Sequence, residues 1–276
     1  MSEPVLLHEP TSWGIRLTLN RPAKLNAISA ELRDALTAAI AEAAEDDRVR
    51  VIVIAGAGRA FCSGYDLSAA APPTAWDWRD VLSKDVAATL AVWSCPKPVI
   101  AQVHGYALAG GLELAMACDL IVAAEGSQLG EPEIRFGSAP VTLLMPFVIG
   151  QKRTRELLMT GDLIDAAEAE RIGLVNRVVP LERLGAEVDT LALKLARVPP
   201  DVMAPTKVML NRAMDGAGFA AAVEMGLDLQ AFVNMSATAR EFDAIVRRDG
   251  LKAALAWRDQ RYEERLAGGG ADEPSD

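Results

Sequence analysis

The chain has 276 residues, of which 51% are hydrophobic and 24% are charged, a composition typical of a globular protein with a sizeable core. Its net charge of −10 argues against a nucleic-acid partner, because binding a polyanion requires a basic face. The cysteines Cys62, Cys95 and Cys118 are too few and too scattered to indicate a disulfide framework or a zinc site. We therefore expect reduced cysteines and no metal.

The sequence also lacks the patterns of a membrane or exported protein. No uncharged stretch reaches the roughly 18 residues that a membrane span needs, and the first ten residues lack a basic segment leading into an apolar one. We therefore expect a cytoplasmic protein with no membrane attachment.

Strand and helix patterns alternate in the first half of the chain. Residues 13–20 alternate apolar and polar side chains, as a half-buried strand does, and a loop follows at 21–26. Ser29 then suits the N-cap of a helix with an apolar face of Leu32, Leu36, Ala39, Ile40 and Ala43. Buried strands are expected at 49–54, 99–103 and 119–123. Together these patterns predict an α/β fold with largely parallel strands.

Helical patterns dominate after about residue 143. They cover residues 153–159, 166–172, 184–196, 206–214, 219–233 and 237–246. Pro199 and Pro200 are the best candidates for a hinge into the last helices, which divides the chain into regions 1–198 and 199–267. The glycine-rich residues 268–276 are expected to form a disordered tail.

A glycine pair near the middle of the chain has the features of an oxyanion-binding helix start. Gly110 and Gly111 allow close approach of a ligand to the backbone, and the first N–H groups of a helix are free to donate to negative charge. Glu113 follows directly, and a second carboxylate, Glu133, comes about twenty residues later. Two carboxylates near one set of donors suggest acid/base chemistry at a carbonyl group.

Several motifs resemble those of the crotonase, or enoyl-CoA hydratase/isomerase, family, and they follow one another in the family's order. The longest includes the glycine pair. The resemblance covers almost the whole chain through the segments 97–120, 20–27, 59–67, 158–162 and 169–176. It implies a core of repeated ββα units in 1–198, a helical trimerisation region in 199–267, and assembly into homotrimers or homohexamers.

The family resemblance also implies acyl-CoA thioester substrates, with no cofactor besides the coenzyme A of the substrate. Two backbone N–H groups, here those of Gly110 and Tyr65, would stabilise the negative charge that develops on the thioester oxygen, each donor being worth on the order of 10²–10³ in rate. Lys24, Asp66 and Leu67 match positions that the family uses around coenzyme A.

The same resemblance gives the two glutamates separate roles. Glu113 would activate a water molecule, and Glu133 would supply a proton to the α-carbon, so that the leading interpretation is a hydratase acting on 2-enoyl-CoA. A Δ3,Δ2-enoyl-CoA isomerase, another crotonase-type acyl-CoA enzyme and a catalytically silent oligomer that binds CoA thioesters are the alternatives. Acyl-chain length is not readable from the sequence.

Some residues depart from the family pattern or allow a simpler interpretation. The segment 138–147 replaces the usual Gly-Gly-Thr-Gln stretch with bulkier apolar residues and two prolines. Glu131 is expected to be solvated at the rim of the site, and His104 to be a hydrogen-bonded structural residue. Lys207 is a possible phosphate contact, although a solvated lysine is the simpler expectation.

Overall fold

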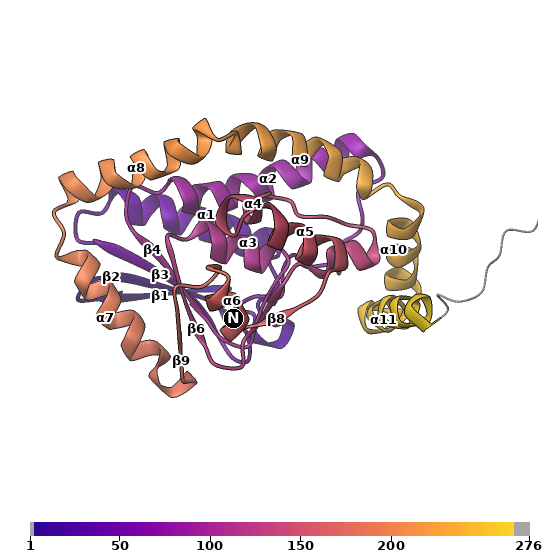
Figure 1. The fold of residues 1–276 in the computed structure, drawn as a ribbon, viewed down its shortest axis with the longest axis horizontal. Helices are drawn as coiled ribbons and strands as arrows, with labels where there is room; N and C mark the ends of the chain where they lie inside the picture. The colour runs from indigo at the N-terminus through magenta and orange to yellow at the C-terminus, as the bar shows by residue number, and fades with distance from the viewer. Residues whose placement is uncertain (1–2, 268–276) are drawn as a thin grey trace, which may run out of the picture.

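The structure, a computed structural model, describes residues 3–267 and shows the predicted α/β architecture (Figure 1). The predicted tail at 268–276 lies outside the described residues. The main sheet has six strands in the order β1-β2-β3-β4-β6-β9, and only the β1–β2 pair is antiparallel. Its strands are β1 (Leu6–Thr11), β2 (Gly14–Leu19), β3 (Val51–Gly56), β4 (Val99–Val103), β6 (Leu120–Ala124) and β9 (Arg177–Val179). The prediction of largely parallel pairing is thus confirmed.

A second, three-stranded sheet lies next to the glycine pair. It consists of β5 (Tyr106–Leu108), β7 (Gln128–Gly130) and β8 (Ile164–Asp165), with β7 in the middle. A bridge between Cys62 and Ala107 joins β5 to the segment that follows β3. This bridge brings the chain around residue 65 to the helix that begins at residue 110.

The helices cover both faces of the main sheet. They are α1 (Ala30–Glu45), α2 (Ala75–Ser94), α3 (Gly110–Ala117), α4 (Met145–Val148), α5 (Gln151–Thr160), α6 (Ala166–Arg171), α7 (Leu184–Ala196), α8 (Pro200–Gly216), α9 (Phe219–Val233), α10 (Ala237–Asp249) and α11 (Leu251–Ala267), with 3-10 turns η1 (Pro22–Lys24), η2 (Pro132–Phe136) and η3 (Leu181–Arg183). Side chains of α1 and α3 belong to the larger core, whereas α7 covers the other face of β3 and β4. Every residue of β3 from 51 to 55 is buried, as expected for a strand between two layers.

The first long helix forms as its sequence predicts. Ser29 Oγ accepts a hydrogen bond from the N–H of Leu32, which satisfies one of the free donors at the start of α1. All five residues of the predicted apolar face are buried. In contrast, the 20-residue helix α2 was not predicted, although Thr74 and Asp77 form a capping box at its start.

The C-terminal helices extend away from the sheet. Helices α8 and α9 run along one side of the molecule, and α10 and α11 form a hairpin at one end (Figure 1). Phe219 of α9 packs on Trp93 of α2, with ring centroids 5.3 Å apart, and the hairpin packs on η2 through Phe242 and Phe136. None of the helices within residues 3–267 has the length and apolarity required to cross a bilayer.

Candidate active site

The glycine pair at the start of α3 lies against the segment that follows β3. A Cβ on Gly110 would come within 2.3 Å of Cε2 of Tyr65, and one on Gly111 within 2.5 Å of the carbonyl oxygen of Cys62. Neither position therefore has room for a side chain. The preceding residue, Ala109, has a φ of 53°, an uncommon conformation for a residue with a Cβ, and its N–H donates to the carbonyl of Gly130 in β7.

Two peptide N–H groups are available as donors beside this contact. Neither the N–H of Gly110 nor that of Tyr65 forms a hydrogen bond with another of the residues 3–267. The two segments adjoin, since a Cβ on Gly64 would lie 3.4 Å from the nitrogen of Gly110. Free backbone donors at adjacent positions are suited to bind one oxygen atom that gains negative charge.

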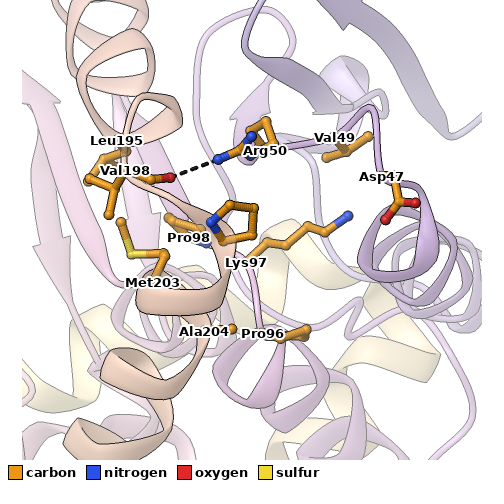
Figure 2. Close-up of a pocket in the computed structure, with 11 residues that line it drawn as sticks. Asp47, Val49, Arg50, Pro96, Lys97, Pro98, Leu195, Val198, Met203 and Ala204 are labelled. Carbon is orange, nitrogen blue, oxygen red and sulfur yellow. Dashed lines mark hydrogen bonds between the residues drawn. The ribbon is translucent and has the colours of Figure 1, made fainter.

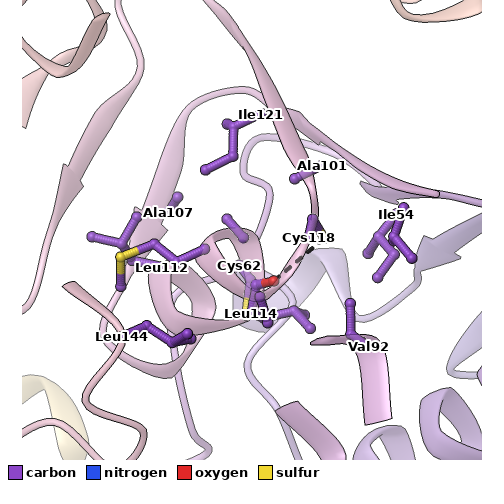
Figure 3. Packing of buried hydrophobic residues seen from close by; sticks show 14 of the residues in the cluster. Ile54, Cys62, Val92, Ala101, Ala107, Leu112, Leu114, Cys118, Ile121 and Leu144 are labelled. Atoms are coloured by element: carbon purple, nitrogen blue, oxygen red, sulfur yellow. Dashed lines mark hydrogen bonds between the residues drawn. The ribbon is translucent and has the colours of Figure 1, made fainter. Parts of the chain in front are cut away.

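Glu113 projects from the first turn of α3 into the protein interior. Its Oε1 accepts a 2.8 Å hydrogen bond from the N–H of Thr142, while its Oε2 is buried without a partner among the described residues. Leu112 and Leu114 flank it within the apolar cluster shown in Figure 3. Burial and then the neighbouring Glu133 raise the pKa of Glu113 well above its usual value, and N–H donors of Thr142 and Val141 act in the opposite direction.

Glu133 is the second carboxyl group of this site. It belongs to η2 and is only 7% exposed, and burial raises its pKa from 4.5 to about 8. Because its charge contributes to the raised pKa of Glu113, the two carboxyl groups are electrostatic neighbours. The structure therefore brings together the two glutamates singled out in the sequence.

Glu131 corrects an expectation from the sequence. It is not a solvated residue at the rim: its exposure is 2%, and its Oε2 is buried without a hydrogen bond to any described residue. Burial, then Glu133 and Glu113, raise its pKa well above the usual value. It directly follows the buried end of β7, where Gly130 packs closely against Asp162 and Leu163. No local pattern in the sequence indicates this long-range packing.

The side chain of Tyr65 forms a wall of the site. Burial, then the charges of Glu113 and Asp85, raise the pKa of its hydroxyl well above 10.0, and the neighbouring side chain of Thr89 in α2 acts in the opposite direction. Asp85 itself pairs with Arg33 at 3.1 Å, and burial raises its pKa to about 6. These α2 residues were missed together with the helix that carries them.

The residues expected around coenzyme A lie on two loops that are bonded to each other. Lys24 is exposed at the end of η1, and Leu67 is also exposed. The N–H of Ser63 donates to the carbonyl of Leu25, which ties the first loop to the segment of Tyr65.

The carboxylate of Asp66 is bound within this pair of loops. It pairs with Arg21 at 2.7 Å and accepts hydrogen bonds from the N–H and hydroxyl of Ser68. Although burial opposes its ionisation, the bonds from Ser68 and Arg21 hold the pKa of Asp66 below its usual value. This side chain therefore fixes the loop.

The side chains of Lys207 and His104 are bonded to other groups of the protein. Lys207 is buried and pairs with Asp119, Nζ to Oδ2, at 2.6 Å, so both expectations for it, a phosphate contact and a solvated lysine, are wrong. Nε2 of His104 lies 2.9 Å from the carbonyl oxygen of Gly58, consistent with the structural role expected for this residue.

A cavity of about 210 Å³, drawn in Figure 2, is lined by residues that do not include the candidate glutamates. Its lining includes Val49 and Pro98, which precede β3 and β4, whereas the candidate site follows the opposite ends of these strands. Its cations are already bonded: Lys97 Nζ donates to the carbonyls of Ala43 and Asp46, and Arg50 to that of Val198. No candidate catalytic residue lines this cavity.

Comparison with known proteins identifies the family. Residues 14–253 match the family model described as enoyl-CoA hydratase/isomerase. The chain is 36% identical over 219 residues to a "Probable enoyl-CoA hydratase" of Mycobacterium bovis, covering 78% of this chain and 84% of that protein. It is 34% identical over 220 residues to a crotonyl-CoA hydratase of Syntrophomonas wolfei, covering 77% of this chain and 83% of the relative.

A solved structure agrees with this match. The crystal structure of an enoyl-CoA hydratase/isomerase from Xanthobacter autotrophicus Py2 superposes with a TM-score of 0.91 at 39% identity, covering 94% of this chain and 99% of that one. The two sheets and the C-terminal helices thus form the crotonase fold that the motifs implied. The chain belongs to the enoyl-CoA hydratase/isomerase, or crotonase, family.

Proposed function

We propose that this protein catalyses the reversible syn addition of water to 2-enoyl-CoA thioesters. The observation that carries the proposal is the burial of Glu113 and Glu133 as electrostatic neighbours, with Glu113 three residues after Gly110, whose N–H bonds to no other group within residues 3–267. The hydratase names of relatives at 34–36% identity support the same reaction.

The proposed mechanism assigns one task to each group. The N–H groups of Gly110 and Tyr65 bind the thioester oxygen. Glu113 takes a proton from water as the water oxygen bonds to the β-carbon, and the electrons of the double bond move to the thioester oxygen as an enolate. The enolate then collapses as Glu133 gives its proton to the α-carbon. The product gains one hydrogen and one hydroxyl group, while Glu113 is left protonated and Glu133 ionised. Loss of a proton from Glu113 and uptake of one by Glu133, through solvent, restores both groups for the next turnover.

The electrostatics support this division of roles. Two adjacent buried carboxyl groups do not both ionise readily, so the pair retains a proton at neutral pH. Glu133, with a pKa raised to about 8, is suited to hold that proton. The backbone donors of Thr142 and Val141 only partly offset the burial that raises the pKa of Glu113, so the proton that the pair retains is shared by two coupled groups, and the assignment of Glu113 as the base rests on its place beside the Gly110 donor.

Substrate binding and assembly complete the proposal. Lys24 and Leu67 would contact coenzyme A, while Asp66 would hold the loop in place through Arg21. Exposed apolar side chains on α8 and α9 would be covered in a homotrimer or homohexamer built by region 199–267; they are Val202, Met209, Leu210, Met225, Leu229 and Phe232.

Hydration of a panel of 2-enoyl-CoA thioesters differing in chain length, branching and aromaticity tests the proposal, with Glu113→Gln and Glu133→Gln as variants. A hydratase loses activity with either variant. Retention of 3-enoyl to 2-enoyl isomerisation by Glu113→Gln would instead indicate the isomerase. Binding of CoA thioesters with no turnover of any panel member would indicate a silent binding protein.

A further inference from the structure

The segment that departs from the family pattern places a hydroxyl group next to the proposed base. Thr142 donates its N–H to Glu113 Oε1 at 2.8 Å, and its side chain is fully buried. Because Oγ1 is only three covalent bonds from that nitrogen, the hydroxyl lies in the immediate neighbourhood of the carboxylate. The backbone of Thr142 is also fixed on its C-terminal side, because the N–H of Leu144 donates a 2.6 Å hydrogen bond to the carbonyl oxygen of Thr142.

One side-chain oxygen of each of these two residues has unused hydrogen-bonding capacity. Thr142 Oγ1 and Glu113 Oε2 are buried, and neither bonds to another group within residues 3–267. The neighbouring side chains of Val141, Leu144 and Met145 are apolar and buried, so they offer the hydroxyl no partner. Buried polar groups are rarely left unsatisfied, because each one costs about 1–3 kcal/mol. A small polar molecule between the two oxygens would satisfy both.

We propose that the Thr142 hydroxyl positions the water molecule that Glu113 activates. The inference rests on the proposed hydration. The water would donate one hydrogen to Glu113 Oε2 and the other to Thr142 Oγ1, which leaves its lone pairs free to attack the β-carbon. In the reverse reaction, the same pair of oxygens holds the departing β-hydroxyl group. Thr142 would thus take over water positioning in a segment whose usual glycines are replaced by apolar residues.

This role predicts a selective defect in Thr142→Val, which removes the hydroxyl but keeps the side-chain shape and the backbone N–H. Hydration falls on the order of 10- to 100-fold, as for one lost hydrogen bond to a reacting group. Exchange of the α-hydrogen of a saturated acyl-CoA in D₂O needs Glu133 and the two backbone donors but no bound nucleophile. That exchange therefore stays within about 2-fold of the wild-type rate.

Thr142→Ser is the matched control, because it retains the hydroxyl, and it should hydrate within about 3-fold of the wild type. The inference is overturned if Thr142→Val hydrates as fast as the wild type, or if hydration and α-hydrogen exchange fall together, which would indicate a merely structural residue. The wild-type arm separates the two proposals: absence of hydration there would contradict the proposed function itself.

Discussion

The ring of Tyr65 occupies the space that a side chain on Gly110 would need, with Cε2 only 2.3 Å from the position of an added Cβ. The two residues proposed to supply the backbone donors are therefore packed against each other. The position of one N–H depends on the absence of a side chain at the other residue. This contact also explains how a bulky tyrosine is accommodated at a position where only the backbone is proposed to act.

Replacement of Gly110 by alanine should separate these two donors. The added methyl group must displace the Tyr65 ring or the start of α3, so we expect kcat/KM to fall on the order of 10²–10³-fold, as for loss of one oxyanion donor. Gly185→Ala is the control, because a Cβ there meets no atom within 4 Å and α7 gains a better helix former. Steady-state kinetics check both variants; an active Gly110→Ala enzyme would exclude the packing argument.

The raised pKa of Glu133 predicts how activity depends on pH. Hydration requires the protonated acid, which is lost as the pH rises through about 8, so kcat/KM for hydration should decline above that value. Measuring kcat/KM between pH 6 and 10, with a 2-enoyl-CoA substrate that can be brought to saturating concentration, shows whether the activity decreases near this pH. A profile that is flat from about pH 7 to 9 would be incompatible with Glu133 as the proton donor.

The same raised pKa has a consequence for stability. Below its unfolded pKa of about 4.5, Glu133 is protonated in both states and has no effect on the pH dependence. As the pH rises toward 8, the unfolded state ionises freely while the folded state does not, so the folded protein loses stability. Glu133→Gln should therefore gain stability relative to the wild type as the pH rises from 5 to 8. Urea unfolding at both pH values measures this; an unchanged difference would argue against the pKa shift.

Lys207 should be important for stability and not for substrate binding. Lys207→Met removes the buried ammonium that pairs with the Asp119 carboxylate, whose side chain is 29% exposed, and should lower the free energy of unfolding by about 1–3 kcal/mol. The KM of the remaining folded enzyme should not change. Lys252→Met, at an exposed position, is the control and should alter stability by less than about 0.5 kcal/mol. A raised KM with intact stability would restore Lys207 as a phosphate contact.

The C-terminal hairpin should help to position Glu133. Arg135 belongs to the same 3-10 turn as Glu133, and its guanidinium lies 3.9 Å from the ring centroid of Tyr262 in α11. Tyr262→Leu removes this contact and should lower kcat about 3- to 10-fold with little change in KM, because small displacements of a catalytic group are costly. Tyr262→Phe keeps the ring and should behave as the wild type. Equal kcat values for the two variants would contradict the role.

The sequence predicted those elements whose local pattern agrees with their packing. The apolar face of α1 was identified completely, and β4 and α7 have the predicted boundaries, because their periodicity coincides with their burial. Helix α2 was missed since its buried residues include the polar Asp85 and Thr89, which blur the helical pattern. The two- and three-residue strands of the second sheet form through long-range pairing and have no clear local signal.

In the candidate site, too, residues within local motifs were predicted, and features that depend on long-range packing were not. Gly110, Glu113 and Glu133 were found because they lie in motifs, whereas the burial of Glu131 depends on its place after β7. The hydrogen bond between Thr142 and Glu113 joins residues 29 positions apart, so no local sequence pattern could predict it. The sequence therefore identified the candidate residues that lie in motifs, but not the contacts that long-range packing forms between them.

Addition of water across the double bond would place two solvent atoms in the product, and isotope labelling follows both of them. We would incubate a 2-enoyl-CoA with the wild-type protein in D₂O enriched in oxygen-18 and analyse the thioester product by mass spectrometry and NMR. We expect one solvent oxygen at the β-carbon and one deuterium at the α-carbon, added to the same face. Deuterium incorporation without oxygen-18, or no incorporation at all with any member of the panel, would contradict the proposed hydration.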